Sequence, residues 1–232
     1  MSIAEIITPE IAFHSGNADI DITDSRIISH AALHGRISGS RRNRLLLLSM
    51  FQLRHRVFKQ RLNWDVVSFN EQERDHFDKI DTDYIITTDI NNNVKGCVRL
   101  LPTTAPYMLS DVFPDLWQSG EPLPCSPAVY ELSRFSFESG RDTALYGFSG
   151  PVIRLLRNLV LYAQHNQISQ YIFVTTSAIE RLLIIQGISI RRVGKAVKIG
   201  NANTVVVFMN INQQTEEAIF NNPGKCYRST RE

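Results

Sequence analysis

The chain has 232 residues, with 25 Lys and Arg against 23 Asp and Glu and a formal net charge of +2. This length fits one large domain or two small ones, and the 43% apolar content argues against global disorder. The near-neutral charge excludes a uniformly basic nucleic-acid binder, and no apolar run approaches the roughly 20 residues that cross a bilayer. Three widely spaced cysteines fit none of the common zinc spacings, and the amino-terminus shows no signal-peptide pattern. We therefore expect no metal site, reduced thiols and a cytoplasmic location.

The balanced total conceals blocks of one sign. Residues 36–61 hold eight basic side chains and no acidic one, whereas residues 65–89 hold eight acidic side chains against two basic ones. The charge of residues 181–198 is again wholly basic. Segregation on this scale indicates either a solvated face or a surface that meets a charged partner.

The chain begins with 40 residues that lack sustained periodicity, from which we expect an N-terminal extension that is partly ordered. One domain is expected over residues 41–232, since no linker or repeat divides it. Apolar residues at helical spacing predict a helix from Arg41 to about Asn63. The acidic stretch 65–81 shows no period and predicts a long loop with one turn.

The later elements alternate between strands and helices, which predicts a mixed α/β domain. A hairpin is expected over 84–101, and residues 129–137 alternate as a strand with Glu131 on one face and Arg134 on the other. A capping box at Ser177 and Glu180 predicts a helix that Gly187 ends. The remaining elements are a short helical piece near 108–113, a helix opened by 149–151, and strands at 171–175 and 204–209.

Glu131 is the most informative single residue, because a carboxylate on an interior strand is costly unless it is paired. It is either a structural ion-pair partner of Arg99 or Arg134, or a general base in a cleft. Asp75 and Asp78 form an acidic cluster that either faces solvent or accepts hydrogen bonds from ammonium and hydroxyl groups of a small ligand.

Two further features have alternative interpretations. Phe58 and Trp64 are either core residues or a surface that stacks on a sulfonium or an adenine. Residues 191–196 match the phosphate loop of acetyltransferases that use coenzyme A, but they follow a helix and lead into a strand. Such a loop should follow a strand and open a helix, so we reject this match.

In their order and spacing, these residues resemble the acyl-homoserine-lactone synthases, the LuxI-type autoinducer synthase family. The motifs are Arg-x3-Phe-x5-Trp, Asp-x2-Asp, Asp-Tyr, Gly-x2-Arg-Leu-x-Pro-Thr, Met-Leu-x3-Phe and Glu-x-Ser-Arg-Phe, spread over about Leu45 to Phe208. They stand here as Arg54, Phe58 and Trp64; Asp75 and Asp78; Asp83 and Tyr84; Gly96, Arg99, Leu100, Pro102 and Thr103; Met108, Leu109 and Phe113; and Glu131, Ser133, Arg134 and Phe135.

The resemblance implies a single three-layer α/β (α+β) domain with a mixed, mostly antiparallel sheet, similar to the N-acetyltransferase (GNAT) fold. It implies S-adenosylmethionine as a substrate rather than a cofactor, and an acyl donor on acyl carrier protein or, alternatively, coenzyme A. The amine of S-adenosylmethionine would attack the thioester, and its carboxylate would then displace methylthioadenosine to close a homoserine lactone, a quorum-sensing signal.

The resemblance also implies roles for individual residues. Glu131 would be the base, directly or through water, with Arg99 and Arg134 as the other catalytic residues. Contacts to S-adenosylmethionine are expected from Arg54, Phe58, Trp64, Asp75, Asp78 and Phe113. The acyl chain would lie against Met108 and Thr176, although the doublet Thr175-Thr176 leaves that register open. Docking of an acidic carrier protein is expected at Arg154, Arg157, Arg181 and Lys195.

Two alternatives stay open at this point. One is a coenzyme-A-dependent N-acyltransferase of the GNAT type, against which the misplaced loop counts. The other is a non-catalytic, partner-binding regulator, which gives no reason for Glu131 to lie in an interior strand beside Arg134. The residues do not determine the length or the 3-oxo substitution of the acyl chain.

Overall fold

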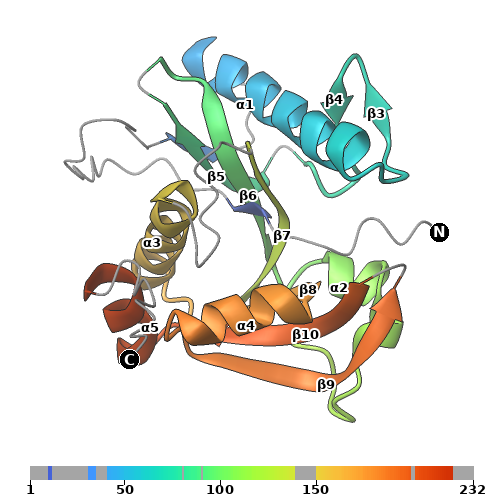
Figure 1. Cartoon of the computed structure of the whole chain (residues 1–232), viewed down its shortest axis with the longest axis vertical. Coiled ribbons are helices and arrows are strands. Elements are labelled where there is room, and N and C mark those ends of the chain that lie inside the picture. Colours follow the sequence, from blue (N-terminus) through green and yellow to red (C-terminus); the bar gives the residue numbers. More distant parts are fainter. Residues whose placement is uncertain are drawn as a thin grey trace, which may run out of the picture.

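The protein is represented by a computed structural model, which describes residues 10–11, 31–34, 41–79, 81–89, 91–138, 150–199 and 202–221. An eight-stranded sheet in the order β2-β5-β1-β6-β7-β8-β10-β9 forms its centre, and helices cover both faces (Figure 1). Among the described strands only β7 and β8 pair in parallel, so the sheet is mixed and mostly antiparallel. The three-layer α/β architecture expected from the sequence is confirmed.

The expected elements are present with small shifts in their bounds. The strands of the sheet are β1 Glu10–Ile11, β2 Ala31–His34, β5 Asp83–Thr88, β6 Val94–Pro102, β7 Val129–Phe137, β8 Gln170–Thr176, β9 Ile190–Ile199 and β10 Ala202–Asn210. The helices are α1 Arg41–Arg54, continued by a π-helix His55–Arg61, then α2 Met108–Asp111, a 3₁₀ turn Pro114–Leu116, α3 Gly150–His165, α4 Ser177–Ile185, and α5 Gln213–Glu216, continued by a π-helix Glu217–Asn221. No helix in these ranges is both long and apolar enough to cross a membrane.

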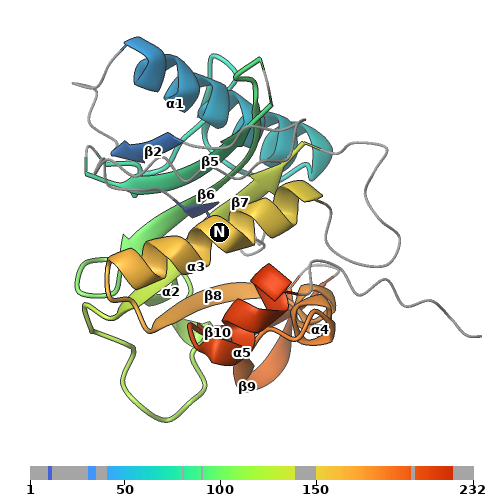
Figure 2. The same cartoon turned by 90° about the vertical axis from the view of Figure 1, so that its left-hand side faces the viewer.

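The two faces of the sheet have unlike neighbours. Alternate residues of β8 separate them, since Tyr171 and Phe173 pack in the cluster that contains the apolar face of α3, whereas Ile172 and Val174 pack in the cluster that contains α2. Helix α3 crosses the face of β6, β7 and β8 that is turned toward the viewer in Figure 2. We call this the α3 face, and the opposite side, where α2 lies, the α2 face.

The parallel strands β7 and β8 pair only at their beginnings, where Val129, Tyr130 and Glu131 lie opposite 170–172. Beyond this point β7 pairs with β6, and β8 pairs with β10, so the two strands diverge (Figure 1). The sheet therefore contains a fork, defined here as the point after Glu131 and Ile172 where β7 and β8 separate. Glu131 lies at its base.

The structure corrects the expected loop over 65–81. A second, two-stranded sheet lies in this stretch, formed by β3 Ser68–Phe69 and β4 Gln72–Glu73. Its turn consists of Asn70 and Glu71, both with positive φ, at 48° and 58°. This geometry fits the twist of a tight hairpin, but two-residue strands are too short to produce a visible alternation in the sequence.

The prediction that Arg134 and Glu131 lie on opposite faces of β7 is also wrong. Strict alternation places it on the side of Tyr130 and Leu132, but its φ is 62° and the register between β6 and β7 shifts at this point. The extra residue is a β-bulge, which turns a side chain onto the other face. As a result the Arg134 guanidinium lies 2.7 Å from Asp75, which also binds Arg99.

Two helix signals can be compared with the structure. Thr176, one residue before the expected Ser177, is the N-cap of α4, since its hydroxyl accepts a hydrogen bond from the Ile179 N–H. Gly187 has a φ of 91° just after α4, which confirms it as the terminator. Residues 191–196 lie inside strand β9, which confirms that they do not form a phosphate loop at a helix start.

Candidate active site

Six charged side chains from four strands and helices and one loop meet in one buried network, which we call the charge network. Its members are Arg54 from α1, Glu73 from β4, Asp75 and Asp78 from the loop after β4, Arg99 from β6, and Arg134 from β7. Three guanidinium groups face three carboxylates, so the network is balanced in charge. Five of these residues were identified from the sequence as candidate catalytic or substrate-binding residues, and Glu73 was missed.

Each guanidinium of the network binds two carboxylates. Arg54 places Nε 2.5 Å from Glu73 and its two terminal nitrogens 2.8 and 3.0 Å from Asp78. Arg99 binds both oxygens of Asp75 at 2.5 and 2.9 Å and one oxygen of Asp78 at 3.0 Å. Such forked contacts fix the orientation of the planar groups as well as their charge.

Arg134 completes the network, with Nη2 at 2.8 Å from Glu73 and 2.7 Å from Asp75. Its Nη1 is buried and has no hydrogen-bond partner among the residues that the structure describes. A buried guanidinium nitrogen without an acceptor is unusual, because an unmade hydrogen bond of a charged group is costly. This nitrogen is available to an acceptor on a bound ligand.

The network lies out of solvent, with exposed fractions of 0% for Arg54, Arg99 and Glu73. Burial by itself would raise the pKa of Asp75, but the Arg99, Arg134 and Arg54 guanidinium groups outweigh burial and lower it below its ordinary value. The pKa of Asp78 is lowered in the same way, since Arg54 and Arg99 outweigh burial. Both carboxylates are therefore ionised at neutral pH.

Glu131 is held by the backbone of α2. Its carboxylate accepts hydrogen bonds from the N–H groups of Met108 and Leu109, both at 2.7 Å, and the side chain is 2% exposed. The structure therefore contradicts a direct ion pair with Arg99 or Arg134 as the reason for its burial. Burial raises the pKa of Glu131 to about 8, although the two N–H donors and the charge of Arg99 oppose this shift.

Met108 connects Glu131 to the charge network. Its backbone N–H binds Glu131, and its sulfur lies 3.3 Å from a terminal nitrogen of Arg99. Arg99 also donates to the Ser133 hydroxyl at 3.1 Å, on the strand that carries Glu131. The network and Glu131 therefore lie on the same face of the sheet.

The aromatic residues of the first motif lie beside the network. Phe58 and Trp64 stack with a ring-centroid distance of 5.0 Å and an interplanar angle of 18°, and the guanidinium of Arg134 lies 5.5 Å from the Phe58 ring. Phe58 has no exposed surface, whereas Trp64 is partly exposed. Phe113 is partly exposed and packs against the apolar cluster of the α2 face. Trp64 therefore offers the accessible surface of the stacked pair.

Two hydroxyls follow each other at the end of β8. The hydroxyl of Thr176 caps α4, but the hydroxyl of Thr175 is fully buried and has no hydrogen-bond partner within the described part of the chain. Thr175 shares its side of β8 with Tyr171 and Phe173, which places it on the α3 face. Between the two residues of the doublet, Thr175 has the uncommitted hydroxyl.

The four expected docking residues have different environments. Arg154 and Arg157 lie on α3 and are partly buried. Arg157 donates to the Ile219 carbonyl at 3.3 Å and lies 6.0 Å from the Phe220 ring, so it holds the final π-helix. Arg181 on α4 and Lys195 on β9 are exposed.

With this geometry in place, the chain can be compared with known proteins. A family model described as autoinducer synthase matches residues 39–219. The chain belongs to the autoinducer synthase family. Acyl-homoserine-lactone synthases from Pseudomonas aeruginosa and Aliivibrio fischeri are 37% and 38% identical to it over 177 and 174 residues. These alignments cover 75% and 74% of this chain and 87% and 90% of the relatives. As a member of this family, the chain is an acyl-homoserine-lactone synthase and thus an acyltransferase.

Solved synthases have the same fold. The synthase LasI is 38% identical with a TM-score of 0.69, covering 77% of this chain and 89% of that chain. BjaI, described as a coenzyme-A-dependent synthase and solved with S-adenosylmethionine and isopentyl-CoA, is 25% identical with a TM-score of 0.68, covering 77% and 82%. A protein described as an N-acetyltransferase from Lactobacillus plantarum, 15% identical with a TM-score of 0.51 and 75% and 94% coverage, shares the fold alone. The GNAT-like fold expected from the sequence is thereby confirmed.

Proposed function

We propose that this synthase acylates the amine of S-adenosylmethionine with an acyl chain delivered by acyl carrier protein, and then closes the lactone with release of methylthioadenosine. The observation that supports this best is the buried charge network beside Glu131 on the α2 face. An apolar cluster lies on the same face, and further apolar side chains line the α3 face. A zwitterionic, cationic substrate suits the charge network, and an acyl chain suits an apolar surface.

S-adenosylmethionine carries a sulfonium, an ammonium and a carboxylate, and the α2 face offers a partner for each. The partly exposed ring of Trp64 suits cation–π contact with the sulfonium or stacking with the adenine. The unpartnered Nη1 of Arg134 is the donor that we assign to the carboxylate. Although the network is balanced in charge, the Asp75 carboxylate is partly exposed and ionised, and it is the acceptor that we assign to the ammonium.

The acyl transfer needs a base, because the attacking amine must lose its protons. In the proposed step the amine nitrogen forms a bond to the thioester carbonyl carbon, Glu131 accepts the proton directly or through water, and the carbon–sulfur bond breaks so that the donor leaves as its thiolate. The raised pKa of about 8 makes the Glu131 carboxylate a stronger base than an ordinary glutamate, and its ionised fraction grows as the pH rises toward 8. In the second step the substrate carboxylate displaces methylthioadenosine. Neither step requires a cofactor or a nucleophile from the protein.

Acyl carrier protein is favoured over coenzyme A by two features of the chain. The sequence that imitates a phosphate loop of coenzyme-A enzymes lies within strand β9. Arg181 on α4 and Lys195 on β9 are exposed basic residues, which suits an acidic carrier. Coenzyme A stays the second candidate, since BjaI is described as coenzyme-A dependent.

The test mixes the protein with S-adenosylmethionine and either acyl carrier protein or coenzyme A loaded with the same chain. We expect methylthioadenosine and acyl-homoserine lactone in equal amounts, with a higher kcat/KM for the carrier protein. No methylthioadenosine with any donor refutes the proposed substrates, and equal or better use of coenzyme A refutes the carrier assignment. Arg181→Glu should raise the KM for the loaded carrier but not for S-adenosylmethionine, and Arg44→Glu, an exposed arginine on α1, is its control.

A further inference from the structure

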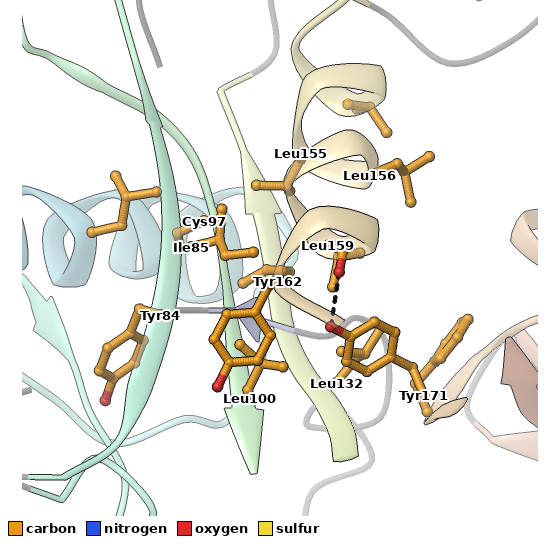
Figure 3. Close-up of a cluster of buried hydrophobic side chains, with 14 of the residues drawn as sticks. Tyr84, Ile85, Cys97, Leu100, Leu132, Leu155, Leu156, Leu159, Tyr162 and Tyr171 are labelled. Carbon is orange, nitrogen blue, oxygen red and sulfur yellow. Dashed lines mark hydrogen bonds between the residues drawn. The ribbon is translucent and has the colours of Figure 1, made fainter. Parts of the chain in front are cut away.

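Tyr84 on β5 is a buried side chain that neither step of the proposed reaction uses. It is 1% exposed, and its hydroxyl donates to Oδ1 of Asp78 at 2.6 Å. The preceding residue, Asp83, accepts a hydrogen bond from Tyr162 of α3, and successive side chains of a strand alternate, so Tyr84 points away from α3. Figure 3 shows the Tyr84 ring on the side of its strand that is turned away from α3. Tyr84 therefore lies on the α2 face, with the charge network.

The Asp78 carboxylate, which accepts this hydrogen bond, joins several parts of the charge network. Its Oδ1 also accepts from Arg54 at 2.8 Å and from Arg99 at 3.0 Å. Its Oδ2 accepts from Arg54 at 3.0 Å and from the backbone N–H of Asp75 at 2.8 Å. A carboxylate offers about four acceptor sites, so these contacts use its capacity. Asp78 therefore holds two guanidinium groups and the backbone of Asp75 in one arrangement.

The turn formed by residues 75–78 carries the acceptor that we assign to the substrate ammonium. Its backbone closes through the N–H of Asp78, which donates to the Asp75 carbonyl at 3.1 Å. The Asp75 side chain is 13% exposed, whereas that of Asp78 is 2% exposed. Tyr84 lies directly opposite Arg99 in the pairing of β5 with β6, so its hydroxyl ties this turn to the sheet. The position of Asp75 thus depends on Tyr84 through Asp78.

The ring of Tyr84 is held independently of its hydroxyl. It packs edge-to-face on Phe51 of α1, with a ring-centroid distance of 6.2 Å and an interplanar angle of 82°. The Phe51 ring in turn lies 5.2 Å from the guanidinium of Arg54 and 4.0 Å from that of Arg74. A phenylalanine at position 84 keeps these ring contacts, so Tyr84→Phe removes only the hydrogen bond to Asp78.

From these contacts we propose that Tyr84 is a positioning residue for S-adenosylmethionine, because its hydroxyl fixes Asp78 and thereby the turn that presents Asp75 to the substrate ammonium. The proposal rests on the proposed function and deepens it, since it names a residue that determines the affinity of the same site for this substrate. Tyr84 acts through Asp78 and does not itself touch the substrate. Its loss therefore affects the binding of S-adenosylmethionine and not the use of the acyl donor.

The test compares Tyr84→Phe with Tyr162→Phe. Tyr162 is the matched control, because it is also 1% exposed and its hydroxyl also donates to an aspartate, Asp83, at 3.0 Å, but on the α3 face. Calorimetry gives the dissociation constant of S-adenosylmethionine, and release of methylthioadenosine gives the KM of each substrate. Tyr84→Phe should raise both constants for S-adenosylmethionine by roughly tenfold, since a hydrogen bond to a charged group that supports the site is lost. The KM of the loaded carrier should not change in this variant, and Tyr162→Phe should leave all three constants unchanged.

A hydroxyl with a merely structural role would lower the urea midpoint of Tyr84→Phe and leave both constants for S-adenosylmethionine unchanged, which overturns the proposal. An equal rise in Tyr162→Phe also overturns it. A structure of the wild-type protein with S-adenosylmethionine needs no variant: an ammonium on Asp75, with Tyr84 still bound to Asp78, supports the proposal, and an ammonium elsewhere overturns it. Failure of the wild-type protein to bind S-adenosylmethionine at all instead refutes the proposed function, so the two failures are distinguishable.

Discussion

Glu73 gives the sharpest test of the charge network, because it joins two guanidinium groups and was not identified from the sequence. Its carboxylate lies 2.5 Å from Arg54 and 2.8 Å from Arg134 and is fully buried. Replacement by Gln keeps the shape but leaves two buried cations sharing a neutral group. Breaking a buried ion pair in this way costs about 3–5 kcal/mol. That is a large part of the roughly 5–15 kcal/mol by which a domain of this size is stable.

The assay is urea unfolding of Glu73→Gln and of a matched control, Glu138→Gln. Glu138 also binds two cations, Lys95 at 2.5 Å and Arg56 at 3.5 Å, but its side chain is 40% exposed. Solvent-exposed pairs contribute about 0–1 kcal/mol, so the control should unfold almost like the wild-type protein. The difference between the two variants isolates burial, since both remove one carboxylate with two partners.

Binding of S-adenosylmethionine supplies a second measurement. The network is neutral with Glu73 and carries one excess positive charge without it. A cationic ligand should then bind more weakly to Glu73→Gln, measured by calorimetry, and with unchanged affinity to Glu138→Gln. If Glu73→Gln lost less than about 1 kcal/mol of stability and bound this ligand like the wild-type protein, the network would not be what organises the site.

Four further predictions concern three residues of the two faces. Glu131→Gln should fold and lose about 10²- to 10⁴-fold in kcat for lactone formation, and full activity would reduce Glu131 to a structural group. The pKa of Glu131 lies at about 8, above its ordinary value of 4.5. The stability that this group contributes is thus complete below pH 4.5 and lost as pH rises through 8. In Glu131→Gln, the free energy of unfolding measured between pH 5 and 9 should no longer fall with pH for this reason. Thr175→Val should reduce any preference for 3-oxo over unsubstituted chains. The control Thr204→Val removes an equally buried and unpartnered hydroxyl on the α2 face of the described structure and should leave that preference unchanged. Equal effects of the two substitutions would argue against a contact between Thr175 and the chain. Arg99, Arg134 and Arg54 lower the pKa of Asp75 despite its burial, so the stability that its ionised form contributes is present above pH 3.8 and lost as pH falls further. Asp75→Asn should therefore reduce the loss of unfolding free energy between pH 4 and 2. The same pH dependence in the variant and the wild-type protein would contradict this.

The charge distribution of the sequence acquires a structural meaning. The basic block at 36–61 and the acidic block at 65–89 supply Arg54 on one side and Glu73, Asp75 and Asp78 on the other. The charges of these four residues, together with those of Arg99 and Arg134, neutralise each other inside the protein rather than on its surface. The net charge of +2 is therefore the sum of buried pairs and of exposed residues such as Arg181 and Lys195.

The sequence by itself determined the elements and most of the charged residues. The hairpin of β5 and β6, strand β7 and helices α1 and α3 follow from apolar periodicity, which is a local property of the chain. Arg54, Asp75, Asp78, Arg99 and Arg134 were identified from their order and spacing, and the structure brings all of them into contact. The family and the GNAT-like fold followed from the same motifs.

Only the tertiary structure decided which atoms meet. Glu73 joins the charge network because a hairpin of two-residue strands turns it inward, and no periodicity reports so short a hairpin. The bulge at Arg134 reverses the face that strict alternation assigns, since one added residue shifts every later side chain. The cap at Thr176, the free hydroxyl at Thr175 and the ring of Tyr171 against α3 depend on contacts between segments far apart in the chain. Pairing register and packing between layers are long-range properties, and local sequence patterns do not encode them.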